Sequence, residues 1–290
     1  MAAVSELRPA PTAGRRGGAG SRWGLLLLPA LVLLLLLFVV PLGLMAWRSV
    51  SDPAPGLGNY EWFFGNTAAV DALKRTLLVA GVCTVACLVV GYPYAYLMTL
   101  VGSKGKAILT LLVLVPFWTS LMVRTFAWRV LLQDTGVVND MLGWIGIGPF
   151  QLIRTTLGVV IGMAQVLAPF MVLPLFSVMT GIDRRLLDAA KGMGARPSVA
   201  FLKVFVPLSM PGVVAGSVTV FISALGFYVT PALLGSPDNA LISQQVFTQV
   251  NGLLEWGRGG AMGMILLVTT LLMLGVVALL AKGSRKRVRG

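Results

Sequence analysis

The sequence predicts an all-α, polytopic membrane protein with about six transmembrane helices. Of its 290 residues, 57% are hydrophobic and 11% are charged, whereas soluble domains are roughly 45–50% apolar and about 25% charged. Long uncharged runs alternate with short charged segments, and a run of about 20 apolar residues crosses the hydrocarbon core as a helix. The basic residues favour alternate connecting segments, which also predicts the direction of each span.

The first 22 residues differ from the rest of the chain. They are rich in Gly, Ala and Pro and carry Arg8, Arg15, Arg16 and Arg22. This composition cannot bury a core, so we expect a basic, disordered cytoplasmic tail over 1–22. The apolar run over 24–47 exceeds the 7–15 residues of a signal-peptide core and lacks a clear cleavage site. We therefore interpret it as a retained first span within a transmembrane domain over 23–282.

Five further apolar runs predict the remaining spans, over 76–101, 107–132, 156–180, 213–235 and 260–281. A second basic tail follows over 283–290. If both termini are cytoplasmic, the inner segments hold sixteen basic residues: Arg8, Arg15, Arg16, Arg22, Lys104, Lys106, Arg184, Arg185, Lys191, Arg196, Lys203, Lys282, Arg285, Lys286, Arg287 and Arg289. The outer loops hold five, together with seven acidic residues. The positive-inside rule therefore predicts this orientation.

The residue inventory restricts the chemistry of the chain. It contains no His, which removes the usual general base and most zinc sites. It also lacks a GxxxxGK[ST] phosphate-binding loop. Cys83 and Cys87 lie four residues apart on one helix face, where disulfide geometry is poor. We therefore expect no metal site, no cofactor and no enzymatic activity, and the dispersed basic residues do not suggest nucleic acid binding.

The long cytoplasmic segment over 181–212 predicts a helix, a sharp turn and a second helix. Apolar residues recur there at helical spacing: Leu186, Leu187, Ala190 and Met193. Asp183 can cap the first helix and Gly194 can end it. Pro197 suits the first turn of the second helix, which we expect Pro207 to interrupt. Such a knob suits docking into a groove on another protein.

This segment resembles the EAA loop of the permease subunits of binding-protein-dependent ABC importers. The family pattern E-A-A, x3, G, x9, I-x-L-P is matched at Asp188, Ala189, Ala190, Gly194, Val204, Val206 and Pro207. The first Glu is Asp here and both aliphatic positions are Val. The resemblance implies the type I ABC importer permease fold and an ATPase-coupling role for Asp188, Ala189, Ala190, Gly194 and Pro207.

The resemblance covers nearly the whole chain beyond the tail and is closest to the branch that imports spermidine and putrescine. It is carried by Asn59-Tyr60 and by residues 91–98, 116–128, 167–176 and 227–235. It implies a multi-pass protein of the bacterial inner membrane that works with a second permease subunit. Two ATPase subunits would bind ATP and Mg²⁺, and an extracytoplasmic solute-binding protein would deliver the solute. The alternative is the same machinery importing another small solute, including an anionic one.

The solute path is harder to predict because no span contains Asp or Glu. A polycation would then need aromatic faces or groups of the partner permease. The candidate path residues are Phe117, Trp118, Phe126, Trp128, Phe227 and Tyr228, although aromatic residues at these spacings also serve packing. Arg124 and Arg129 are the charged residues inside a predicted span. They would repel a polyamine if they faced the path, so they either face away or favour an anionic solute.

Three other functions remain as alternatives. A secondary transporter would need intramembrane carboxylates or broken-helix ion sites, and inverted repeats. A lipid-modifying enzyme would need acid, base or metal ligands near the membrane surface, and outer-loop Asp134 and Asp140 are too few. A scaffold that recruits partners would need only the cytoplasmic knob. Membrane lipid is an expected partner of the basic tails in every case.

Overall fold

The computed structural model describes the backbone of residues 19–287 and the side chains of residues 28–279. The predicted tails, 1–22 and 283–290, therefore carry no described side chains. Within the described range every regular element is helical. Five helices are long and apolar enough to cross a membrane, and a bent pair of helices makes a sixth candidate. The predicted fold class is confirmed.

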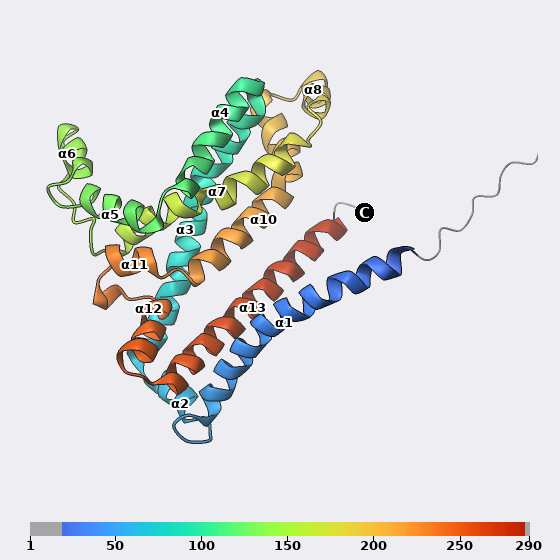
Figure 1. Ribbon diagram of the computed structural model, residues 1–290. Coiled ribbons are helices and arrows are strands. Elements are labelled where there is room, and N and C mark those ends of the chain that lie inside the picture. The colour runs from blue at the N-terminus through green and yellow to red at the C-terminus, as the bar shows by residue number, and fades with distance from the viewer. Residues whose placement is uncertain (1–18, 288–290) are drawn as a thin grey trace, which may run out of the picture.

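Three helices form the body of the fold: α3 (Thr67–Leu100), α7 (Thr156–Thr180) and α10 (Val206–Leu225). They pack against one another along their lengths, and α4 (Ser103–Leu114) lies beside them (Figure 1). Cys83 and Cys87 are buried in this core as free thiols, as predicted.

The body helices approach one another closely at three glycines. A Cβ atom placed on Gly216 of α10 would lie 2.8 Å from Sδ of Met171 on α7. One on Gly212 would lie 3.1 Å from Cβ of Val178, and one on Gly91 of α3 would lie 3.1 Å from Cγ of Met171. Gly212 and Gly216 are four residues apart, the spacing by which small residues bring two membrane helices into contact.

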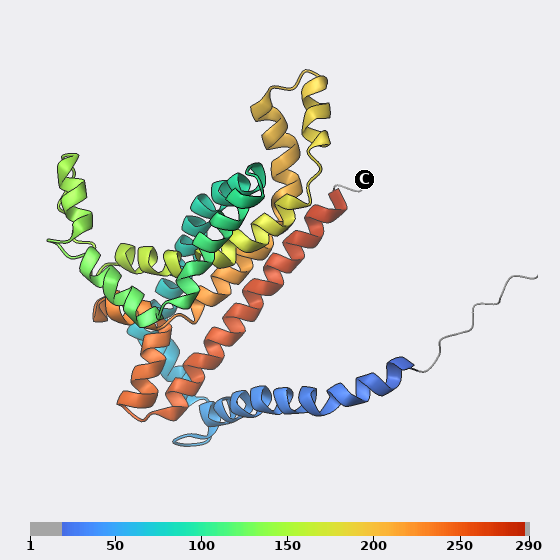
Figure 2. The ribbon, with the colours of Figure 1, turned by 45° about the horizontal axis from the view of Figure 1, so that its top comes forward.

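The first and last long helices form a separate arm. α1 (Ala19–Ser51) and α13 (Trp256–Arg287) lie side by side near the bottom of Figure 1, where α2 (Gly58–Gly65) and α12 (Ile242–Phe247) join them to the body. Figure 2 shows α1 leaving α13 toward its N-terminus. We call this junction the α2 end, and the opposite end, which carries α8 (Arg185–Gly192), the α8 end.

Polar side chains hold the α2 end together. The Asn59 amide donates to the carbonyl oxygens of Ser49 (3.0 Å) and Asp52 (2.7 Å), so it clamps the last turn of α1 onto α2. The hydroxyls of Ser49 and Tyr60 are 2.8 Å apart. Thr76 Oγ1 of α3 accepts a hydrogen bond from the first amide of α12, at Ile242 (2.9 Å). The Asn59-Tyr60 pair therefore has a structural role here.

The predicted third span, 107–132, is not one straight helix. α4 tightens into a 3₁₀ turn, η1 (Val115–Trp118), and the chain then bends by 99° into α5 (Leu121–Leu131). Pro116 lies inside the 3₁₀ turn, and Thr119 and Ser120 are extended. Proline lacks an amide hydrogen and clashes with the preceding turn, so Pro116 removes one helical hydrogen bond next to this break.

The predicted fifth span, 213–235, is displaced toward the α8 end. Helix runs continuously from Pro197 to Leu225, through α9 (Pro197–Ala200), the π-helical turn η2 (Phe201–Phe205) and α10. The expected interruption at Pro207 is wrong. The wider π turn pairs the Val206 amide with the Phe201 carbonyl five residues earlier, which makes room for the proline ring. Gly226 ends the helix, and α11 (Val229–Leu234) is separate.

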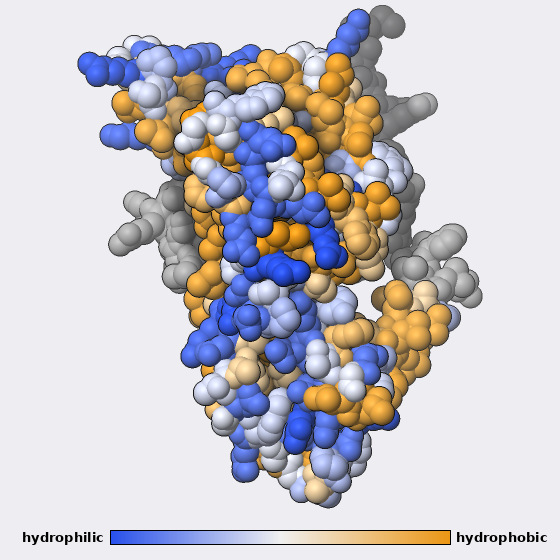
Figure 3. Space-filling view, turned by 90° about the vertical axis from the view of Figure 1, so that its left-hand side faces the viewer, coloured by the Kyte–Doolittle hydropathy of each residue, from blue (hydrophilic) through white to orange (hydrophobic). Residues whose placement is uncertain are grey.

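Shorter elements cover the surface away from the α8 end. They are α6 (Val137–Trp144), the 3₁₀ turn η3 (Pro237–Asn239) and the π turn η4 (Thr248–Gly252). Asn139 holds α6 in place by donating to the carbonyls of Gln133 and Phe150 and accepting from the Phe150 amide. Viewed from the left of Figure 1, this side has a hydrophilic band between hydrophobic flanks (Figure 3).

The Gly216 contact predicts a test of the body packing. Gly216→Val should overpack the α7–α10 contact, which typically costs about 1–3 kcal/mol, and lower the midpoint of thermal unfolding of the purified protein. Gly275→Val on α13 is the matched control, because a Cβ there meets no atom within 4 Å. Equal midpoints for the two variants would contradict the close contact.

Candidate functional site

The segment predicted to be a docking knob is a compact helical hairpin at the α8 end. The Asp183 carboxylate accepts a hydrogen bond from the Arg185 amide (2.9 Å) and so caps α8, as expected. At the other end, the Gly194 amide donates to the Lys191 carbonyl and the Ala195 amide to the Ala190 carbonyl. Gly194 has φ +89°, the left-handed conformation that ends helices in this hydrogen-bonding pattern. Its role as a helix stop is confirmed.

The motif residues of the knob differ in their exposure to solvent. Asp188 is exposed and lies 3.1 Å from Lys191 Nζ. Because such a surface ion pair contributes only about 0–1 kcal/mol, the carboxylate is free to exchange partners. Ala189 is exposed, whereas Ala190 is buried against the hairpin. Met193, 84% exposed, stands at the tip. The knob therefore offers a small, partly apolar surface with one carboxylate.

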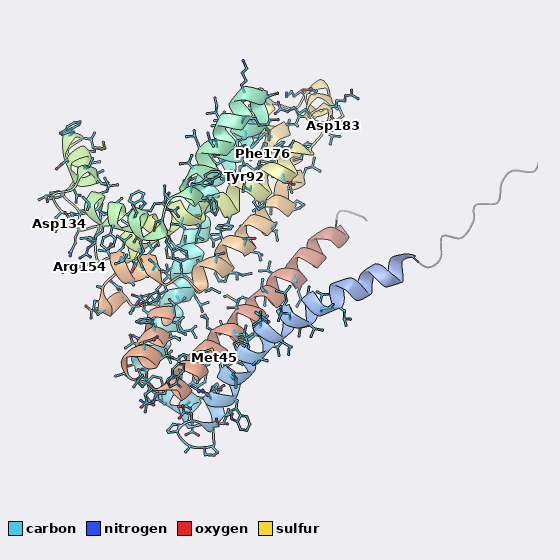
Figure 4. The ribbon with its side chains drawn as sticks, in the orientation of Figure 1. Met45, Tyr92, Asp134, Arg154, Phe176 and Asp183 are labelled. Atoms are coloured by element: carbon cyan, nitrogen blue, oxygen red, sulfur yellow. The ribbon has the colours of Figure 1, made fainter. Side chains whose placement is uncertain are left out.

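An aromatic cluster fastens the knob to the body. Phe201 and Phe205 of η2 are stacked, with ring centroids 5.4 Å apart. Tyr96 of α3 meets both edge-on, at 5.1 Å each, and Tyr92 meets Phe201 at 6.4 Å. The Tyr92 hydroxyl is 2.8 Å from Ser209 Oγ on α10. Figure 4 shows Tyr92 within the body and Asp183 on the knob. The four rings, here called the aromatic lock, join the knob to α3 and α10.

A second link runs from the start of α8 to the end of α3. Arg184 donates to the carbonyl oxygen of Thr99 (2.6 Å) and to its hydroxyl (3.3 Å). Leu187, on the inner face of α8, packs against the main core. The knob is therefore held to α3 at two separate points.

The six path candidates do not form one cluster. Phe117, on η1, meets Phe170 of α7 edge-on at 5.6 Å and is half exposed. Trp118 (73% exposed) and Phe126 also show their rings at the surface. Trp128 and Phe227 instead pack against the main core. The structure therefore divides these five candidates into an exposed group and a group that packs against the main core.

Tyr228 lies in a different place from the other candidates. Its ring contacts that of Phe247 (4.9 Å) and lines a cavity of about 380 Å³ between the arm and η4. The guanidinium of Arg48 lies 4.9 Å above the Trp256 ring on another wall of this cavity. Met45, labelled in Figure 4 where α1 meets α13, completes the α1 side.

The two arginines of α5 have unequal surroundings. Arg129 is exposed, whereas Arg124 is partly buried and its Nε has no hydrogen-bond partner among the described residues. The neighbouring Thr125 is buried, 3.4 Å from Thr230 of α11 between their hydroxyl oxygens. Arg124 therefore lies beside the α5–α11 contact, and Arg129 lies at the protein surface.

Sequence reasoning missed the residues that connect the knob to the body. Tyr92 and Tyr96 belong to the 91–98 stretch that carries the resemblance, and Arg184 contributes to the charge of the inner segments, but the sequence assigned neither these three residues nor Phe201 and Phe205 to this connection. Their helical spacing, four residues between the tyrosines and four between the phenylalanines, is a visible signal. Their partners lie on other helices, about a hundred residues away in the chain, so the pairing itself could not be predicted.

Comparisons with known proteins agree with these features, although no protein-family model matches the chain. It is 34% identical over 206 residues to the spermidine/putrescine transport system permease protein PotB of Escherichia coli (strain K12), covering 70% of this chain and 75% of that protein. It is 32% identical over 211 residues to the inner membrane ABC transporter permease protein YdcU of the same strain, covering 68% and 67%.

A solved structure shares the fold. A chain of the bacterial alginate ABC transporter, in complex with an alginate pentasaccharide-bound periplasmic protein, matches with a TM-score of 0.71 at 20% identity. The match covers 93% of this chain and 96% of that chain. At this identity the similarity concerns the fold, and it confirms the expected fold of an ABC importer permease.

The aromatic lock predicts a local effect of mutation. Phe205→Ala removes a buried ring, a change that typically costs about 3–5 kcal/mol, and should detach the knob. We expect trypsin cleavage within 184–196 to accelerate by at least about tenfold, measured by mass spectrometry. Leu202→Ala is the control, because Leu202 in the same π turn is 62% exposed. Unchanged cleavage of the Phe205 variant would refute the anchoring role.

Proposed function

The chain belongs to the permease subunits of ABC importers, and we propose that it forms one half of the membrane path of a polyamine importer. As such a subunit it is a multi-pass protein of the inner membrane and a transport component rather than an enzyme. The observation that supports polyamine as the solute is the 34% identity to the spermidine/putrescine permease.

The proposed orientation places the α8 end and both termini in the cytoplasm. The described basic residues at the α8 end are Lys104, Lys106, Arg184, Arg185, Lys191, Arg196 and Lys203. The loops of the other end carry five basic residues, Arg48, Lys74, Arg75, Arg154 and Arg258, beside seven acidic ones, Asp52, Glu61, Asp71, Asp134, Asp140, Asp238 and Glu255. This distribution follows the positive-inside rule.

The partners proposed for this chain follow from its place in such a transporter. The knob, with Asp188, Ala189, Ala190 and Gly194, docks one of two ATPase subunits, which bind ATP and Mg²⁺. A second permease completes the path. An extracytoplasmic solute-binding protein delivers the solute at the α2 end, in line with the periplasmic protein bound to the alginate transporter.

The contacts of the knob support a mechanical role in transport. Closure of the ATPase subunits would displace α8, and the aromatic lock and the Arg184–Thr99 bonds would carry that displacement to α3 and α10. Because glycine contacts pack α3, α7 and α10 tightly, these helices would move as one body relative to the arm. This is alternating access by a shift between two packed states.

The proposed path uses aromatic faces in place of intramembrane carboxylates. Phe117, Trp118 and Phe126 present exposed rings that can attract ammonium groups through cation–π interactions. Tyr228 does so in its cavity, while Trp128 and Phe227 support these positions from the core. The exposed Arg129 would favour an anionic solute if it faced the path, so the choice of solute has to be measured.

The direct test is transport by the complete assembly in liposomes, with this chain, its partner permease, the ATPase and the solute-binding protein. We expect spermidine to stimulate ATP hydrolysis and to accumulate inside, with no uptake when ATP is omitted. Assembly and basal ATP hydrolysis without any response to spermidine would reject the polyamine proposal. Stimulation by an anionic solute in the same liposomes would then identify the alternative.

A second prediction concerns the knob. Gly194→Arg places a long charged side chain at a position with φ +89°, where the backbone strain is about 1–2 kcal/mol, and should reduce co-purification of the ATPase by at least about tenfold. Gly194→Asn is the control, because asparagine tolerates the left-handed conformation and is short. Normal ATPase binding and uptake by the Arg variant would contradict the docking role.

A further inference from the structure

Two buried polar groups inside the predicted spans have no hydrogen-bond partner among the described residues. One is Nε of Arg124 on α5, and the other is Oε1 of Gln165 on α7. Gln165 is the tenth of the 25 residues of α7, so it lies about 14 Å from the start of that helix. The hydrocarbon core supplies no water to such groups, and leaving them unpaired is costly. Because a guanidinium donates and an amide oxygen accepts, the two groups are complementary.

Contacts along α5 and α7 show which of their residues lie opposite each other. At the end of α5, Cδ1 of Leu132 lies 3.6 Å from a Cβ atom placed on Gly158 of α7. Before α5 begins, the Phe117 ring of η1 meets the Phe170 ring of α7. The two segments therefore pair in opposite order, with residue numbers falling from 132 to 117 as they rise from 158 to 170. Positions 124 and 165 both lie near the middle of this pairing.

Thr230 of α11 links the two helices at this middle point. Its hydroxyl oxygen lies 3.4 Å from that of Thr125 on α5. Its methyl carbon lies 2.8 Å from a Cβ atom placed on Gly162 of α7. Arg124 directly precedes Thr125, and Gln165 lies about one turn beyond Gly162. The two unpaired groups therefore belong to residues that flank the same contact between α5, α7 and α11.

Arg124 and Gln165 lie on the facing sides of their helices. Arg124 is four residues from Trp128, so the two share one face of α5, and Trp128 packs against the main core. Gln165 is three residues from Gly162 and shares its face of α7, the face that Thr230 approaches. Both side chains are partly buried. A change of side-chain rotamer or a small shift of α5 would therefore bring donor and acceptor together.

The arrangement of the chain allows such a shift. α5 packs mainly against α11 and makes few direct contacts with α7. Two extended residues, Thr119 and Ser120, precede α5, and α11 is separated from α10 by a break that begins at Gly226. Short breaks at the ends of helices can absorb changes in φ and ψ. α5 and α11 can therefore move together relative to α7.

We propose that Arg124 and Gln165 form a latch between the α5–α11 pair and α7. In one state of the transport cycle, the guanidinium of Arg124 donates to Oε1 of Gln165, which satisfies both buried groups. The latch is open in the state that this structure shows. Hydrogen bonds that involve a charged group are the stronger class, so the closed latch favours one of the two states. This inference rests on the proposed transport function but not on the identity of the solute.

Cross-linking of the complete transporter in nanodiscs tests the latch. Arg124→Cys and Gln165→Cys are combined in a chain in which Cys83 and Cys87 are replaced by Ala, and a bifunctional thiol reagent is added. One sample contains no nucleotide, and the other is trapped with ATP and vanadate. We expect the cross-linked fraction, measured by mass spectrometry, to differ several-fold between the two samples, because the residues meet in only one state. No solute is needed for this measurement.

The matched control combines Thr125→Cys and Thr230→Cys in the same background. Their hydroxyl oxygens are 3.4 Å apart, and α5 and α11 move together in this proposal, so this pair should cross-link equally in both samples. Equal cross-linking of the Arg124→Cys and Gln165→Cys pair would overturn the latch. A high yield in both samples would mean a permanent contact, and a low yield in both would mean that the residues never meet.

A second measurement distinguishes a latch from two independent residues. Arg124→Leu and Gln165→Leu should each change the rate of ATP hydrolysis by the complete transporter by about tenfold. The double variant should match the single variants, whereas independent effects would multiply to about a hundredfold. Thr219→Val is the control and should keep the wild-type rate, because the Thr219 hydroxyl bonds only within its own helix.

The outcomes separate this inference from the function on which it rests. Single variants with the wild-type rate, or effects that multiply, would overturn the latch while transport by the wild-type complex stands. A wild-type complex that hydrolyses ATP but does not respond to spermidine would reject polyamine as the solute and leave the latch unaffected. Failure of the wild-type chain to bind any ATPase would reject the proposed function and the latch with it.

Discussion

The close packing of α3, α7 and α10 is the constraint on which the rest of this structure depends. In a membrane, lipid tails are as apolar as leucine side chains, so helices do not associate through the hydrophobic effect and must gain from direct packing. Gly91, Gly212 and Gly216 allow that packing by removing side chains at the points of contact. The body that results is held together by direct contacts among all three helices.

The knob is attached to this packed body by side-chain contacts. The exposed surface of the knob is small, and its Asp188–Lys191 ion pair is weak. The stronger contacts are those that attach the knob to the body. Stacked and edge-on rings join η2 to α3, and Arg184 ties the start of α8 to the end of α3. The π turn allows the helix to continue through Pro207 into α10. The second helix of the knob and a membrane-spanning helix are therefore one continuous structure.

The arm is packed differently from the body. α1 and α13 pack mainly on each other and on the short helices of the α2 end, where Asn59 and Thr76 provide polar clamps. Toward the α8 end, few other residues of the protein pack against the arm. Apolar side chains of α13 remain exposed there, beside the groove between α3, α10 and α13. The described residues therefore form a tightly packed body and an arm that contacts it mainly at the α2 end.

The sequence by itself determined that the chain is helical and membrane-spanning, where most spans lie, and where the helical hairpin of the knob lies, because hydrophobic runs, charge distribution and capping residues act locally. It also identified Gly194 as the helix stop. Only the tertiary structure decided that the third predicted span bends by 99° after Pro116, that helix continues through Pro207, and which aromatic residues are exposed. These outcomes depend on contacts between residues far apart in the chain, such as Tyr96 with Phe205, and no local pattern encodes such contacts.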